Sequence, residues 1–141
     1  MSRIYWDSML FIYWLEDRAG YARRVDAIYT RMQQRGDRLI TGAFTFGEVL
    51  AGVYRQGEVA LAGETRSLLQ NVVSEVIPFT LETSDHYARI RATFDVKGPD
   101  AIHLACAAQA GADLFLTNDN ELVGKYVPGI QFIGSLDTPL L

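Results

Sequence analysis

The chain has 141 residues, of which 49% are hydrophobic and 21% are charged, and its formal net charge is −4 at pH 7. This length fits one domain spanning residues 1–141, and the composition is ordinary for a soluble globular protein. The acidic balance argues against a general nucleic-acid coating protein, which is usually basic, but it does not exclude a nuclease.

Short apolar runs alternate with helical patterns along the chain, which is typical of an α/β fold with a parallel sheet. Five runs are predicted to be strands: Arg3–Trp6, Leu39–Thr41, Glu75–Pro78, Leu114–Thr117 and Gln131–Ile133. We therefore expect a central, mostly parallel sheet that is flanked by helices on both faces.

Apolar residues at helical spacing fill the gaps between these strands. The predicted helices run from Ser8 to Leu15, from Tyr21 to the stop signal Gly36, from Phe44 to near Gly57, from Val59 to Val73, from Leu81 to Phe94 and from Pro99 to Ala110. The first is apolar but has no basic stretch before it and no cleavage site after it, so it does not resemble a signal peptide, and no stretch reaches membrane-spanning length. The last contains Cys106, the only cysteine, which excludes an intrachain disulfide and favours a reducing cytoplasm.

Four acidic residues lie where a strand ends or a helix begins: Asp7, Glu48, Asp100 and Asp119. In a parallel α/β sheet these places share the carboxyl edge. The loop Asp95–Pro99 must cross back to that edge, because two helices separate the third and fourth strands. Each acid alone could be a helix cap, a favourable charge at a helix N-terminus or a solvated residue. Together they predict a Mg²⁺ or Mn²⁺ site, because one like-charge pair at about 4 Å costs about 4 kcal/mol without a cation.

The motifs around these acids resemble the PIN domain family, and more narrowly the single-domain ribonuclease toxins of VapC type. They are Asp7 after the first strand, Thr45–Leu50 around Glu48, Asp100–Ala105, and Leu116–Asp119. The order of the motifs and the length of the chain agree with that family, so the resemblance covers nearly the whole chain. It implies a PIN-like three-layer fold.

The resemblance also implies a Mg²⁺- or Mn²⁺-dependent endoribonuclease that is the toxin of a type II toxin–antitoxin pair. Its catalytic residues would be Asp7, Glu48, Asp100 and Asp119, and the metal would be held by Asp7, Asp100 and Asp119. Thr117 would match a hydroxyl that supports the metal site, with Asn118 beside it. RNA would be the substrate, and a small antitoxin and a second copy of the chain would be the partners of this cytoplasmic protein.

Several alternatives stay open at this point. The chain could be a PIN-like nuclease of general RNA processing without an antitoxin, or a non-catalytic PIN-like binding module. Glu48 could reach the metal through water or orient the attacking water, and Gly47 before it weakens the helix that aims it. Asp95 competes with Asp100 as a site residue. His103 is expected to be a packed or supporting histidine and not a general acid.

Overall fold

The computed structural model describes residues 1–17 and 20–139. The elements in chain order are β1 (Arg3–Trp6), α1 (Ser8–Glu16), α2 (Ala22–Arg35), β2 (Arg38–Gly42), α3 (Ala43–Arg55), α4 (Val59–Val72), β3 (Glu75–Ile77), α5 (Leu81–Thr93), α6 (Gly98–Ala110), β4 (Leu114–Leu116) and β5 (Ile133–Gly134). Each predicted helix and strand is present, and the largest shift is that of β5, which begins two residues later than expected. The predicted α/β class is therefore confirmed.

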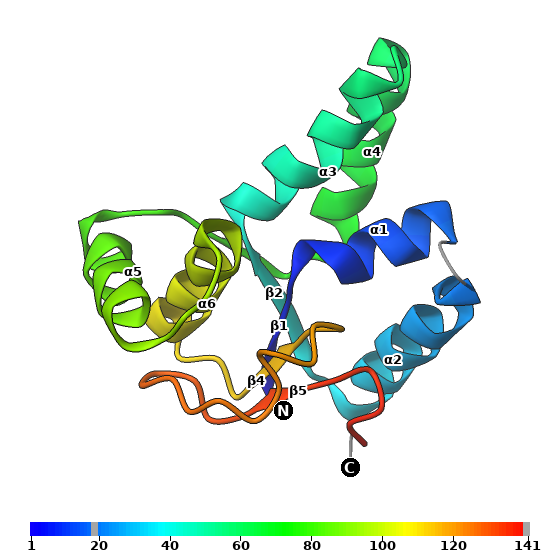
Figure 1. The fold of residues 1–141 in the computed structure, drawn as a ribbon. Helices are drawn as coiled ribbons and strands as arrows, with labels where there is room; N and C mark the ends of the chain where they lie inside the picture. The colour runs from blue at the N-terminus through cyan, green and yellow to red at the C-terminus, as the bar shows by residue number, and fades with distance from the viewer. Residues whose placement is uncertain (18–19, 140–141) are drawn as a thin grey trace.

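The five strands form one sheet in the order β3-β2-β1-β4-β5, and every neighbouring pair is parallel. The sheet is thus wholly parallel, where the sequence predicted a mostly parallel one. Figure 1 shows α5 and α6 on one side of the strands and α1 and α2 on the other, while α3 and α4 project from the end at which the strands stop. None of the helices in the described part of the chain is long and apolar enough to cross a membrane.

Two hydrophobic clusters fill the space on the two faces of the sheet. Tyr5 belongs to the cluster beneath α5 and α6, whereas Ile4 and Trp6 belong to the cluster beneath α1 and α2. Successive side chains of a strand point to opposite faces, so a central parallel strand must be apolar along its whole length. This explains the continuous apolar run in β1, which occupies the middle of the sheet.

The strand register sets the positions of the site residues. Trp6 of β1 pairs with Leu116 of β4, so the residues that follow them, Asp7 and Thr117, leave the sheet side by side. On the other side of β1, Tyr5 pairs with Ile40, two residues before Gly42 at the start of α3. The carboxyl ends of β1, β2 and β4 therefore meet at one edge, where α1 and α3 begin.

Candidate active site

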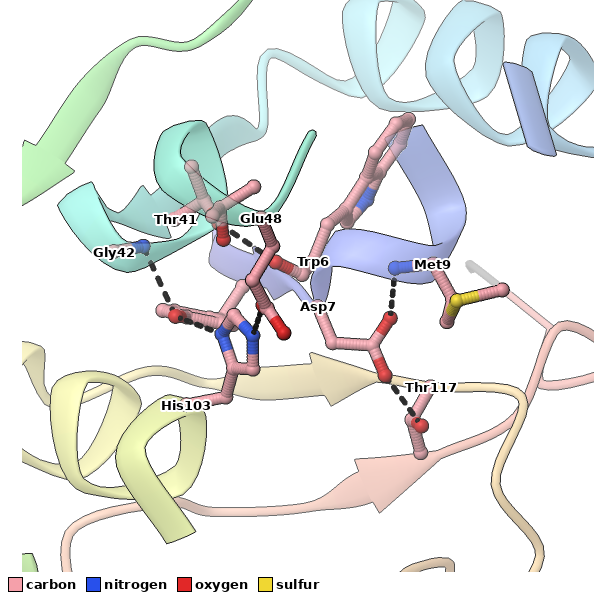
Figure 2. Close-up of polar contacts among 10 residues, drawn as sticks. Trp6, Asp7, Met9, Thr41, Gly42, Glu48, His103 and Thr117 are labelled. Atoms are coloured by element: carbon pink, nitrogen blue, oxygen red, sulfur yellow. Dashed lines mark hydrogen bonds and ion pairs between the residues drawn. The ribbon is translucent and has the colours of Figure 1, made fainter. Parts of the chain in front are cut away.

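Asp7 is a buried acid that joins the ends of β1 and β4. Its side chain is 8% exposed. Asp7 Oδ1 accepts a hydrogen bond from the Met9 backbone N–H at 3.0 Å and caps α1, while Oδ2 accepts one from Thr117 Oγ1 at 2.7 Å (Figure 2). Asp7 is thus a helix cap and also belongs to the sheet edge where the other predicted acids lie.

The surroundings of Asp7 disfavour its charged form. Burial raises the pKa of Asp7 to about 6, even though the Thr117 hydroxyl, the charge of His103 and backbone N–H groups all act to lower it. No lysine or arginine in the described part of the chain forms an ion pair with this carboxylate. A cation bound beside Asp7 would supply the missing positive charge.

Thr117 connects Asp7 to the loop after β4. Its hydroxyl donates to Asp7 and accepts from the backbone N–H of Asp119 at 3.0 Å. Asp119 Oδ1 in turn accepts from the Glu121 backbone N–H at 2.9 Å. Asn118 turns to the other side and donates from Nδ2 to the Tyr13 hydroxyl of α1 at 3.1 Å. Thr117 therefore holds Asp7, and Asn118 fixes the loop against α1.

Asp100 lies in the first turn of α6, and its surroundings place it at the same edge. Its pKa is raised by burial and by the charge of Asp119, opposed by His103 and Lys97, and raised further by Glu48. Asp100 precedes His103 by one turn of α6, and His103 contacts Glu48 of α3, so the chain does cross back to this edge before α6 begins. Asp95 is exposed and lines a surface cleft beside Asp100.

Glu48 comes to this edge from α3, which runs unbroken from Ala43 to Arg55 through Gly47. Glu48 Oε1 is 2.5 Å from His103 Nε2. Burial alone would raise the pKa of Glu48, but the hydrogen bond and charge of His103, with a hydrogen bond from Ser8, outweigh it and lower the pKa below its usual value. Glu48 is therefore held by α6 and α1, so its direction does not depend on helix bending at Gly47.

His103 is buried, with 3% of its surface exposed, and it is hydrogen-bonded at both ring nitrogens. The expectation of a packed histidine is confirmed, while its supporting role stays a prediction. The spacing of three residues after Asp100 indicates that both side chains lie on one side of α6. Tyr5, which binds the other nitrogen of His103 at 2.8 Å, was not a predicted site residue. The position of Tyr5 in the apolar run of β1 predicts that its side chain is buried, but it does not indicate what the hydroxyl contacts.

The donor set fits a hard divalent cation, although its side chains are not gathered into a closed cage. Among the described residues, no three His, Cys, Asp or Glu side chains come close enough together to form a ready-made metal site. Mg²⁺ usually keeps several waters and takes one or two carboxylates directly, so carboxylates spread along one edge are compatible with it. Oxygen ligands alone favour Mg²⁺ or Mn²⁺ over softer metals.

Comparison with known sequences places this site in a family. The profile of the PIN domain matches residues 4–126, a span that contains all four predicted acids. The chain belongs to the PIN domain family. PIN-domain proteins are generally nucleases that use divalent metals, in agreement with the carboxylate edge described above. No curated protein sequence matches the chain.

Solved structures share the fold of this PIN domain at low sequence identity. VapBC2 of Rickettsia felis, bound to a DNA fragment from its promoter, aligns with a TM-score of 0.73 at 13% identity over 94% of this chain and 98% of that one. FitAB bound to an IR36 DNA fragment gives 0.72 at 17% identity over 94% of each chain. A toxin–antitoxin complex from Klebsiella pneumoniae gives 0.64 at 19% identity over 90% and 94%.

Proposed function

We propose that this PIN-domain protein is a Mg²⁺- or Mn²⁺-dependent endoribonuclease and the toxin of a toxin–antitoxin pair. The observation that carries the proposal is Asp7, a buried carboxylate with no lysine or arginine partner among the described residues, bonded to Thr117 at the edge where the charges of Asp119 and Glu48 raise the pKa of Asp100. A protein that used these acids only for packing would gain by neutralising them, because unpaired buried charges are costly.

In this proposal Asp7, Asp100 and Asp119 hold the metal. When bound, the ion supplies an acidified water and neutralises phosphate oxygens of the RNA backbone. Glu48, ionised and held by His103, either orients the attacking water or reaches the ion through one. Thr117 keeps Asp7 turned toward the site, and Asn118 holds the loop that carries Asp119.

The catalytic part is tested by cleavage of a mixed RNA pool with Mn²⁺, comparing wild type with Asp7→Asn. We expect cleavage by wild type that stops in EDTA and a loss of at least about 100-fold in the variant. Asp85→Asn is the matched control, because it makes the same chemical change in an exposed carboxylate that pairs with Arg89 on α5. Equal cleavage with and without EDTA, or full activity of Asp7→Asn, contradicts the proposal.

The antitoxin part rests on a groove between α1, α3 and α4. The groove has a volume of about 870 Å³ and reaches Glu48 at the active-site edge. Its walls include the apolar side chains of Ile12, Val53 and Leu61, and its floor includes Gly47 and Gly52, which let a partner backbone come close. Such a groove suits an amphipathic segment that buries one apolar face. The similar fold of the toxin–antitoxin complex from Klebsiella pneumoniae supports this choice of partner.

A small reading frame next to this gene would encode the candidate antitoxin, and its product can be tested by calorimetry. Leu61→Asp places a charge in the groove and should weaken binding by at least about tenfold. Leu81→Asp is the control, because Leu81 is 90% exposed on α5 and does not line the groove. The absence of any such neighbouring frame would favour a nuclease of general RNA processing. Light scattering of the free protein tests the proposed homodimer.

One observation favours the alternative of a non-catalytic binding module, namely that the described carboxylates do not form a preassembled metal cage. Calorimetric titration with Mn²⁺ separates the two functions. A nuclease of this design binds Mn²⁺ in wild type and loses affinity in Asp7→Asn, whereas a module whose acids serve packing binds none. A null titration of the wild-type protein would overturn the catalytic proposal.

A further inference from the structure

A hydrogen-bonded chain runs from Glu48 at the surface into the core of the protein. Glu48 Oε1 lies 2.5 Å from His103 Nε2, and His103 Nδ1 lies 2.8 Å from the Tyr5 hydroxyl. The Tyr5 oxygen also accepts the backbone N–H of Gly42 at 3.0 Å. Figure 2 shows His103 between Glu48 and the residues of this buried end. The chain links α3, α6, β1 and the end of β2.

The direction of the bond to Glu48 follows from the donors and acceptors available. The Gly42 N–H can only donate, so Tyr5 accepts from it and keeps one proton to give. That proton goes either to His103 Nδ1 or to the hydroxyl of Thr41 or Thr45, both of which are within bonding reach of Tyr5. In either arrangement His103 Nε2 carries a proton, and the Glu48 carboxylate, which has none to give, accepts it.

The imidazole is also fixed by packing. The Phe44 ring lies against His103 with a centroid distance of 5.4 Å, and the Tyr5 ring meets it edge-on at 5.9 Å. The backbone at Gly42 is equally confined, because a Cβ there would lie 2.8 Å from the Tyr5 hydroxyl and 3.2 Å from Cys106 Sγ. The chain of contacts therefore ends on rigid backbone. Of its side chains, only that of Glu48 reaches the site.

We propose that His103 is a positioning residue that aims Glu48 at the attacking or metal-bound water, with Tyr5 and Gly42 fixing the imidazole. This inference rests on the proposed nuclease function. Packing alone does not account for the contact, because Glu48 is partly exposed and the ionised side chain could otherwise remain in water. Holding it instead restricts its rotamers before RNA arrives, and such supporting contacts are worth about 10- to 100-fold in activity at comparable sites.

The test is a double-mutant cycle in single-turnover RNA cleavage at saturating Mn²⁺. His103→Gln and Tyr5→Phe should each lower the rate at saturating RNA about 10-fold or more, with little change in the RNA concentration that gives half-maximal rate. In a Glu48→Ala background, either change should cost less than about twofold, because its target is gone. Equal losses in both backgrounds would show a merely structural role and overturn the inference.

A second measurement does not depend on activity. The buried His103 Nε2–H should give a strongly downfield proton resonance that is absent in His103→Gln and retained in His86→Gln, the only other histidine. It should move upfield in Glu48→Gln, because the acceptor loses its charge. If the chemical shift of this resonance is unchanged in Glu48→Gln, the inference is overturned. Wild type that shows the resonance but cuts no RNA supports the aiming of Glu48 and overturns the proposed function instead.

Discussion

Replacing Asp7 with Asn should stabilise the metal-free protein at neutral pH but not in acid. The pKa of Asp7 rises from its usual 3.8 to about 6 on folding because the carboxyl group is buried. Since a tenfold change in proton affinity is worth about 1.4 kcal/mol, ionised Asp7 lowers the free energy of unfolding by up to about 3 kcal/mol. Asn never ionises and avoids this cost.

The sign follows from proton binding. Below pH 3.8 Asp7 is protonated in both folded and unfolded chains, so its ionisation has no effect on stability. Between pH 3.8 and about 6 the unfolded chain releases this proton while the folded chain keeps it, so wild type loses stability relative to the variant as the pH rises, and the loss is complete above the folded pKa. Asn cannot accept from Met9 and Thr117 as two carboxylate oxygens do, which subtracts about 1 kcal/mol at every pH without changing this trend.

Thermal unfolding in EDTA at pH 4 and pH 7 measures the effect. The advantage of Asp7→Asn over wild type should grow by about 2–3 kcal/mol between the two pH values, or about 5–10 °C in Tm for a chain of this size. Asp85→Asn, at an exposed carboxylate, should follow wild type at both pH values. Parallel curves for Asp7→Asn and wild type would show that Asp7 is not strained in the folded protein. Adding Mn²⁺ should raise the Tm of wild type and not that of Asp7→Asn.

Three further predictions concern the other parts of the site. Asp100→Asn should raise the Tm in EDTA and abolish RNA cleavage, because the pKa of Asp100 is raised by burial and by neighbouring carboxylates; a lower Tm would contradict this repulsion. Thr117→Val should lower the free energy of unfolding by about 1–3 kcal/mol and slow cleavage, because the Asp7 carboxylate and the Asp119 N–H both lose a hydrogen-bond partner. An unchanged urea unfolding curve would contradict this prediction. Gly47→Ala and Gly63→Ala should each stabilise a helix by up to about 1 kcal/mol, because neither added Cβ meets another atom. Only Gly47 lines the groove, so only Gly47→Ala should weaken antitoxin binding in calorimetry.

The fold was predictable because each helix and strand is indicated by the pattern of the residues within it. Apolar runs of strand length alternate with helical spacing, and Gly36 and Gly111 close α2 and α6 in the left-handed conformation. The least accurate element is β5, which has two residues and lies at the sheet edge. Its position depends on pairing with β4, whose partner residues are distant in the chain, and not on a pattern of its own.

The site was predictable only as far as backbone geometry determines it. Asp7 and Asp119 reach one edge because they follow parallel strands that end together, and Asp100 joins them because α6 begins there. The aim of Glu48 was not predictable, because it depends on His103, which is 55 residues away on another helix. Sequence reasoning gave that role to the helix around Gly47, which the structure shows to be regular.

The opposite pKa changes at Asp7 and Glu48 indicate how the proposed work is divided. His103 and Ser8 stabilise the charged form of Glu48. Glu48 is therefore ionised before a metal binds, and its carboxylate can accept a hydrogen bond from a water. Burial disfavours the charge of Asp7, so its ionisation near neutral pH should be coupled to cation binding. Two acids at one edge thus differ because Asp7 is buried beyond what the Thr117 hydroxyl offsets, whereas the contact of Glu48 with His103 outweighs its burial.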